Sequence, residues 1–133
     1  MINNATKIKI TVIFILVALT ACNEVKIYPG RVEIVDRSFD QTLQDSAMIH
    51  GYVLDASEEK PLWNLSVILI TETGDTTLCD SIGYYFIKLL PGIYTVECFY
   101  LLPTQNDSLK LENLKILPNE KVQVNFFKEV EVS

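Results

Sequence analysis

Apolar and polar residues alternate in short runs from Ile49 to the end of the chain, and no strong helical periodicity interrupts them. Because successive side chains of a strand point to opposite faces, this period of two predicts strands that each bury one side. The predicted strands are residues 48–56, 64–72, 76–80, 84–90, 93–102, 107–117 and 120–130. The pattern therefore predicts an all-β domain over residues 47–130, folded as a seven-stranded antiparallel sandwich.

Turn-forming residues separate the predicted strands. Gly74-Asp75, Pro91-Gly92 and Pro118-Asn119 each lie between two of the alternating runs. Proline presets one backbone angle, glycine and asparagine accept a positive φ, and aspartate bonds to nearby backbone groups. Short strands joined by such turns are typical of antiparallel sheets.

The first 21 residues have the features of a secretory signal peptide. Lys7 and Lys9 precede an uncharged apolar run over residues 10–21, which then ends in small residues. This run is shorter than the roughly 20 residues that span a bilayer. A membrane anchor that stays on the protein is the alternative.

The last four residues of this region, Leu19-Thr20-Ala21-Cys22, resemble the lipobox of bacterial lipoproteins. The resemblance implies cleavage before Cys22 and lipid on its sulfur and amine. Two or three acyl chains hold a protein stably on a membrane. Asn23 follows the cysteine, which by the same resemblance favours the outer membrane; whether the domain faces the periplasm or the outside stays open.

Residues 22–46 mix charged residues with the Pro29-Gly30 turn signal. Residues 31–36 alternate briefly, and residues 39–47 are compatible with one helical turn. We expect a tether that lifts the domain off the membrane. The alternative is an additional strand on the edge of the main fold.

Four short motifs carry a family resemblance. They are Ile49-x-Gly51-x-Val53-x-Asp55, Pro61-Leu62 with Val67-x-Leu69, Asp80-x-x-Gly83-x-Tyr85-x-Ile87, and Leu90-Pro91-Gly92-x-Tyr94-x-Val96. In this order and spacing they resemble the carboxypeptidase regulatory-like domain, also described as transthyretin-like or prealbumin-like. The resemblance implies an Ig-like or prealbumin-like sandwich over most of the chain after Cys22. Cys79, Tyr85 and Trp63-Asn64 depart from the usual family pattern.

Several of these positions carry a physical expectation of their own. Gly51 should allow a neighbour to pack closely against the first strand. Asp80 should accept backbone hydrogen bonds in its turn, where Gly83 takes a positive φ. Tyr85 and Tyr94 should enter the core, and each then needs a partner for its hydroxyl.

Charge and composition exclude one function class. The 133 residues include 11 basic and 17 acidic side chains, a net charge of −6, with no basic cluster of the kind that nucleic acid binding requires. Removal of residues 1–21 takes away Lys7 and Lys9, which leaves 9 against 17, or −8. Such a chain is repelled by an anionic lipid surface, so the lipid on Cys22 must provide the membrane attachment.

The sequence predicts no catalytic residue, metal ligand or cofactor. His50 is the single histidine, and its parity in the strand points it away from Ile49 and towards solvent. Glu58-Glu59 lies in a polar turn rather than in a carboxylate pair suited to acid–base chemistry. Asp36, Asp40 and Asp45 lack the central glycine of a calcium loop.

Cys79 and Cys98 are expected to be unpaired. An envelope compartment permits disulfides. However, we expect Leu78 to face the core, which turns Cys79 outward while Cys98 points inward. Opposed side chains cannot form a bridge without backbone movement.

Trp63, Phe99 and Tyr100 are the candidate residues for partner binding. Trp63 follows the Pro61-Leu62 turn, and Phe99 and Tyr100 belong to an apolar strand end. Exposed aromatic residues beside a turn often anchor an interface. The alternative is that these side chains cover one end of the sandwich core.

These observations predict a lipid-anchored, non-catalytic accessory module of the bacterial cell envelope. Its partner would be an envelope protein or a glycan, in addition to the membrane contacted through Cys22. One alternative is a small transthyretin-like hydrolase, which would need several convergent histidine and arginine residues. Another is a structural subunit that pairs with a partner through an edge strand.

Overall fold

The computed structural model describes residues 24–62, 66–101 and 108–133, and these residues form ten strands and one short 3-10 turn. The strands are β1 (Lys26–Tyr28), β2 (Arg31–Phe39), β3 (Ala47–Asp55), β4 (Ser66–Ile70), β5 (Thr76–Leu78), β6 (Tyr84–Leu89), β7 (Gly92–Tyr100), β8 (Ser108–Ile116), β9 (Glu120–Lys128) and β10 (Val130–Val132). The all-β prediction is confirmed, and the described residues contain no α-helix.

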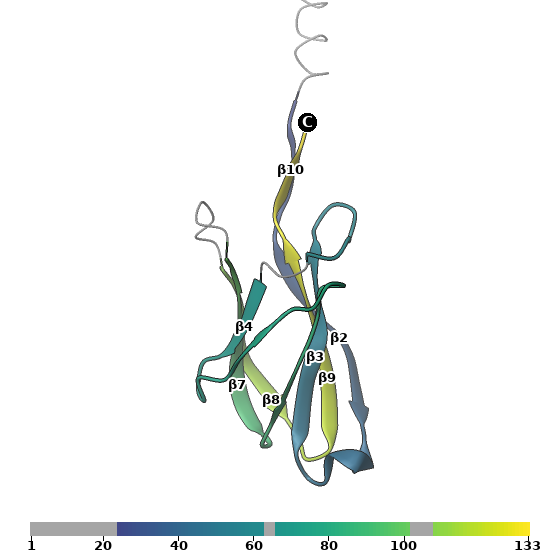
Figure 1. Cartoon of the computed structure of the whole chain (residues 1–133), viewed down its shortest axis with the longest axis vertical. Coiled ribbons are helices and arrows are strands. Elements are labelled where there is room, and N and C mark those ends of the chain that lie inside the picture. Colours follow the sequence, from purple (N-terminus) through teal and green to yellow (C-terminus); the bar gives the residue numbers. More distant parts are fainter. Residues whose placement is uncertain (1–23, 63–65, 102–107) are drawn as a thin grey trace, which may run out of the picture. The chain divides into compact units, whose positions relative to one another are not determined.

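Two four-stranded sheets make up the compact unit that runs from Tyr28 to Val130 (Figure 1). One sheet has the order β2-β9-β3-β6 and is called the β3 sheet below. The other has the order β5-β4-β7-β8 and is called the β7 sheet. The chain ends form a separate unit, in which β1 and β10 pair as a two-stranded ribbon.

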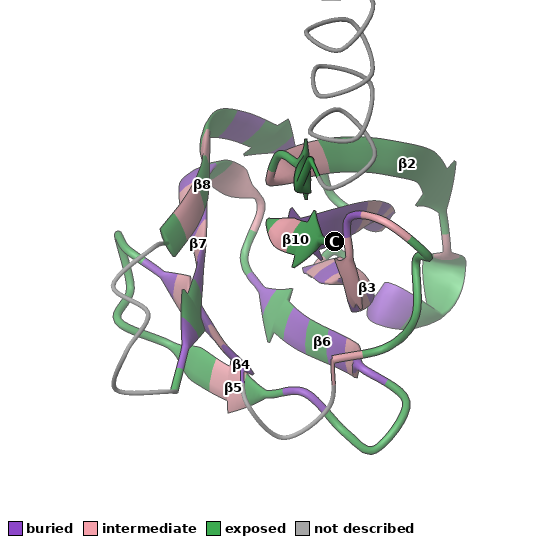
Figure 2. Ribbon diagram, turned by 90° about the horizontal axis from the view of Figure 1, so that it is seen from above, coloured by how far each residue is buried: buried purple, intermediate pink, exposed green. Residues whose placement is uncertain are grey.

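The core lies between the two sheets, and the alternation seen in the sequence supplies it. In β3, β4, β6 and β7, every second residue is buried, which gives the striped strands of Figure 2. The largest fully buried side chains include Tyr85, Phe126, Ile49, Ile68 and Ile70. Fully burying an aliphatic or phenyl side chain stabilises the fold by about 1.5 to 3 kcal/mol. The inward faces of the strands therefore hold the sandwich together.

The predicted count and orientation of strands need correction. The seven predicted strands correspond to β3 through β9, and β1, β2 and β10 are additional. The sheets are not purely antiparallel, because β9 pairs in parallel with β3 and antiparallel with β2. After β8 in the β7 sheet, the chain enters the β3 sheet between β2 and β3. Sequence periodicity does not encode this insertion, since alternation is the same in either orientation.

The expectation that residues 22–46 form a tether is wrong for β2, and the alternative of an edge strand is correct. Strand β2 pairs with β9 from Arg31 opposite Phe127 to Phe39 opposite Glu120. Most of β2 is exposed, as the outermost strand of its sheet, so its apolar alternation is weak. The signal peptide over residues 1–21 and Cys22 lie outside the described residues.

The segment between β2 and β3 forms the helical turn that the sequence allowed. Asp40 Oδ1 accepts the backbone N–H of Thr42 at 2.9 Å and so caps the 3-10 turn Gln41–Leu43. Leu43 is buried and fixes this turn against the domain. The β3 sheet thus begins at Arg31, well before residue 47.

Gly51 allows β3 and β9 to approach closely, because it has no side chain. A Cβ added to Gly51 would lie 1.9 Å from the carbonyl oxygen of Val124. That oxygen accepts the hydroxyl of the buried Tyr85 at 2.6 Å, while Asn125 Oδ1 accepts the backbone N–H of Tyr52 at 3.0 Å. The expectations that Gly51 permits close packing and that Tyr85 needs a hydroxyl partner are both confirmed.

The predicted turn chemistry is also confirmed. Asp80 Oδ1 accepts the backbone N–H of Ile82 and of Tyr84, and Gly83 has a φ of 77°. The hydroxyl of Tyr94 donates to the carbonyl of Leu90 at 2.6 Å, which joins the core to the turn after β6. These bonds fix β6 relative to β7.

Replacing Tyr85 with phenylalanine should destabilise the fold by about 1 to 2 kcal/mol, because the buried Val124 carbonyl loses its hydrogen bond. Urea unfolding of the wild type and of Tyr85→Phe measures the difference. The matched control is Tyr52→Phe on the exposed side of the sheet, which should change stability by less than about 0.5 kcal/mol. Equal stability of all three proteins would contradict the role given to the Tyr85 hydroxyl.

Candidate binding surface

The structure separates the residues that the sequence grouped as a binding site. Trp63 lies outside the described residues. Tyr100 is buried in the core at 9% exposure, and Lys128 Nζ lies 4.9 Å from its ring centre. Phe99 points the opposite way and is 37% exposed on the outer face of the β7 sheet. There it forms an apolar cross-strand row with Val67 and Leu78.

Cys79 and Cys98 are both free and both buried, so the prediction of unpaired thiols is confirmed. The reason given for it is wrong, because Cys79 is only 5% exposed whereas Leu78 is 61% exposed. The register explains this: Leu78 pairs with the outward-facing Val67 of β4. Strand β4 lies between β5, which Cys79 directly follows, and β7, which contains Cys98. Burial raises the pKa of each thiol to about 12, so neither is a reactive nucleophile at neutral pH.

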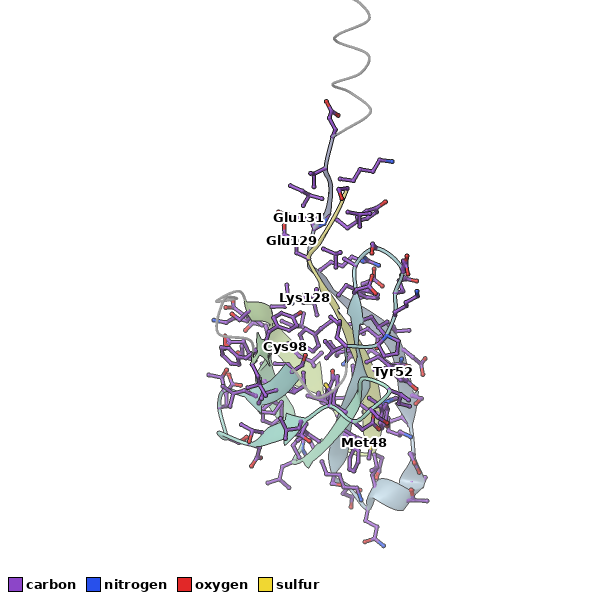
Figure 3. The ribbon with its side chains drawn as sticks, turned by 45° about the horizontal axis from the view of Figure 1, so that its top comes forward. Met48, Tyr52, Cys98, Lys128, Glu129 and Glu131 are labelled. Carbon is purple, nitrogen blue, oxygen red and sulfur yellow. The ribbon has the colours of Figure 1, made fainter. Side chains whose placement is uncertain are left out.

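An aromatic cluster on the outer face of the β3 sheet was not identified from the sequence. On β3 and β6, residues His50, Tyr52, Tyr84 and Phe86 all point away from the core. Register places Tyr52 opposite Tyr84 and His50 opposite Phe86. In Figure 3, Tyr52 lies on the side of this sheet that faces away from Cys98 of the β7 sheet. We call these four residues the Tyr84 cluster.

Tyr84 is the centre of this cluster. Its ring centroid lies 5.3 Å from that of Tyr52, 6.1 Å from that of His50 and 6.4 Å from that of Phe86. The rings are tilted relative to one another, as is usual for aromatic pairs. Phe86 is 53% exposed, and the other three side chains are half-buried. The cluster is therefore a packed but solvent-accessible group of rings.

Two amide side chains of β9 continue the cluster across the sheet. Gln123 lies opposite His50 in the parallel register. Gln123 Nε2 donates to Asn125 Oδ1 at 3.4 Å, and the same oxygen accepts the backbone N–H of Tyr52. Because Asn125 Oδ1 has two donors, the orientation of its amide is fixed. The amides thus lie in defined positions beside the aromatic rings.

The Tyr84 cluster is uncharged at neutral pH. Burial lowers the pKa of His50, the positive charge of Lys121 lowers it further, and Asp36 opposes this in part. Burial also raises the pKa of Tyr84, as do Tyr52 and Asp80. Charged groups of both signs border the cluster, with Lys88 on β6, Lys121 on β9 and Asp36 on β2.

A groove of about 460 Å³ lies between β2 and β8, lined by residues that include Ile34, Leu111 and Leu117. Two of its ionic residues bond to each other: Arg37 Nε and Nη2 each lie 3.1 Å from a carboxylate oxygen of Glu120. Arg37 also donates to the carbonyl of Lys115 on β8. These contacts connect the two sheets at this edge, and we give the groove a structural role.

Within the described residues, no group of three or more histidine, cysteine, aspartate and glutamate side chains is arranged to hold a metal ion. In the same part of the chain, no helix is long and apolar enough to cross a membrane. The ring neighbour of His50 is Tyr84 rather than a nucleophile. The observations describe an all-β sandwich protein with an aromatic outer face.

No protein-family model matches this chain, and no curated protein matches it either. The carboxypeptidase regulatory-like resemblance therefore rests on the four sequence motifs and stays a prediction.

The sequence did contain a signal for the Tyr84 cluster. His50 and Tyr52 are two residues apart, and so are Tyr84 and Phe86. Each pair must therefore share one strand face. Only the register between β3 and β6 brings the two pairs together.

Proposed function

We propose that this protein is a lipid-anchored, non-catalytic binding module of the bacterial cell envelope, with a fold of the carboxypeptidase regulatory-like kind. The observation that carries the binding role is the Tyr84 cluster, four aromatic rings on the open face of a rigid sheet. Exposed aromatic groups of this kind mark interaction surfaces, because they provide a large apolar area at a low cost in side-chain entropy.

The anchor part of the proposal rests on Leu19-Thr20-Ala21-Cys22. Only eight residues (23–30) lie between Cys22 and the first residue of β2, so the two Cα atoms are nine residue steps apart (31 − 22). At about 3.5 Å per residue, an extended chain of this length spans about 30 Å. A lipid on Cys22, in the outer membrane by the proposed sorting, would keep the sandwich close to the bilayer.

The hydrolase alternative has less support. Such an enzyme would need several histidine and arginine side chains at one site, whereas His50 is the single histidine of the chain. Its described ring neighbour is aromatic, and its lowered pKa follows first from burial rather than from a catalytic partner. Neither buried thiol is available as a nucleophile at neutral pH.

Pairing through an edge strand also has less support. Of the four sheet edges, β2 is interrupted by a bulge between Ile34 and Asp36, and β8 by one opposite Tyr94 and Val96. Bulges on edge strands hinder pairing with another chain. Strand β5 has three residues, which leaves β6 as the remaining edge of useful length.

Replacing Cys22 with serine should release the protein from the membrane. In a bacterial host fed with radiolabelled palmitate, we expect the wild type to be labelled and to sediment with membranes after a wash in high salt. The Cys22→Ser variant should be unlabelled, because the acyl chains attach through the cysteine sulfur. Cys98→Ser, a change in the core, serves as the control for cysteine loss and should stay labelled. An unlabelled wild type would contradict the anchor.

A photo-crosslinking experiment tests the binding part of the proposal. A photoreactive phenylalanine at position 86, on the Tyr84 cluster, should crosslink to an envelope component in intact cells. The same residue at position 78, on the outer face of the other sheet, is the matched control and should not give that product. Identical products from both positions would contradict a binding role for this face.

A further inference from the structure

We propose that the Tyr84 cluster, together with the amide of Gln123 that Asn125 holds in place, binds an uncharged carbohydrate chain. This inference rests on the proposed function as a binding module and names its ligand class. Three features of the β3 sheet lead to it: the aromatic rings, the fixed amides beside them and the charge of the surface.

The aromatic rings supply the apolar half of a carbohydrate site. The face of an aromatic ring carries partial negative charge, and the C–H groups of a sugar ring carry partial positive charge, so the two attract. Phe86 is 53% exposed, and its ring packs against the half-buried Tyr84, which in turn contacts His50 and Tyr52. Rings that are already packed lose little entropy when a ligand binds.

The amides supply the polar half. Sugar hydroxyls both donate and accept hydrogen bonds, and a carboxamide offers both functions in one plane. Asn125 is only 8% exposed, and its Oδ1 accepts the N–H of Tyr52 and a hydrogen bond from Gln123, so its role is to orient Gln123. The half-buried Gln123 lies opposite His50 beside the rings and is the amide that a ligand can reach. A purely apolar protein surface would take the half-buried Gln123 amide out of water without offering it new hydrogen bonds, which costs free energy.

The charge of this surface distinguishes between the possible ligands. The cluster and the two amides are uncharged, although the chain carries a net charge of −6. The charges at its border, Lys88, Lys121 and Asp36, are of both signs and do not form a site for an ion. An anionic lipid surface or a second copy of this chain would be repelled by the overall negative charge. An uncharged polyhydroxylated ligand matches both the neutral face and its rim of hydrogen-bonding groups.

Affinity electrophoresis of the full chain in non-ionic detergent tests the inference. Native gels contain one neutral polysaccharide each: a linear β-glucan, a dextran, a mannan or a galactan. We expect at least one of them to retard the wild type. Phe86→Ala, at the most exposed ring, should weaken that retardation at least tenfold in dissociation constant, and Gln123→Ala at least threefold.

Leu78→Ala is the matched control, since Leu78 is an apolar residue of comparable exposure (61% against 53% for Phe86) on the other sheet, and it should stay within twofold of the wild type. Circular dichroism and thermal melting show whether each variant is folded. We expect Phe86→Ala to fold, because substitutions at exposed positions change stability little. Retardation that is equal in the wild type and in folded Phe86→Ala would overturn the inference, and so would no retardation by any of the four polysaccharides.

The outcomes also separate this inference from the proposed function. If no polysaccharide binds and position 86 crosslinks to a protein, the carbohydrate inference is wrong and the binding module stands. If position 86 crosslinks to nothing and no polysaccharide binds, both are wrong. If sedimentation shows a dimer that Phe86→Ala dissociates, the face binds a second copy and the carbohydrate inference is again wrong.

Discussion

Replacing Gly51 with alanine is expected to destabilise the fold by at least about 3 kcal/mol, the largest effect of any single methyl group in this domain. The added Cβ would lie 1.9 Å from the Val124 carbonyl oxygen and 2.7 Å from its carbonyl carbon. Both atoms belong to the backbone of β9, a strand that is bonded on both sides. The strand cannot move away without breaking its pairing with β2 or the bond from Tyr85.

The matched control is Gly74→Ala. No atom lies within 4 Å of the place that a Cβ on Gly74 would take, although its φ of 75° is unfavourable for alanine. We expect this change to cost only about 1 kcal/mol, which is the strain of a left-handed residue. Urea unfolding at neutral pH measures both variants. If Gly51→Ala were no less stable than Gly74→Ala, the close approach of β3 and β9 would not be as the structure has it.

Replacing Glu120 with alanine is expected to destabilise the fold by about 2 to 3 kcal/mol, the second-largest effect. Glu120 is 4% exposed, and its carboxylate accepts bonds from two nitrogens of Arg37 and from the backbone N–H of Leu117. Arg37 is 40% exposed, so water can solvate part of its charge in the variant. The expected loss of stability is therefore at the lower end of the range for breaking a buried ion pair. The matched control is Glu112→Ala, 63% exposed, which should cost less than about 0.5 kcal/mol.

The contribution of Glu120 should depend on pH. The hydrogen bonds from Arg37 are the main reason that the pKa of Glu120 lies below its usual value of 4.5. A carboxyl group with a lowered pKa in the folded state stabilises the fold above its unfolded pKa. This stabilisation disappears as the pH falls through the folded pKa. The stability difference between wild type and Glu120→Gln should therefore shrink between pH 6 and pH 3. A difference that stayed constant over this range would contradict the pairing.

Much of the fold was predictable from local pattern. All seven predicted strands are present as β3 to β9. Strands such as β3 and β7 were predictable because they bury one face and so alternate clearly. Residues with a special local role, such as Asp80 and Gly83, were also predictable, since a turn acts on its own few residues. Strand β2 was assigned to a tether because an edge strand exposes most of its side chains and leaves a weak pattern.

The prediction that Cys79 faces outward was wrong for a different reason. Hydrophobicity alone suggested that Leu78 faces the core, yet the pairing of β5 with β4 puts Leu78 outside and Cys79 inside. The strand is three residues long, so its own pattern is too short to fix its phase. Its register with the neighbouring strand β4 determines which of its side chains face the core.

The sequence by itself determined most of the strands and turns and the buried face of strands such as β3 and β7, because these depend on residues close together in the chain. The lipid on Cys22 stays a prediction from the sequence. Only the tertiary structure decided that β9 inserts between β2 and β3, and that His50 and Tyr52 meet Tyr84 and Phe86. Strand order and register are set by the packing of distant segments against one another. The candidate binding surface therefore depends on the tertiary structure. The pair on β3 and the pair on β6 form the Tyr84 cluster only when the two strands lie side by side.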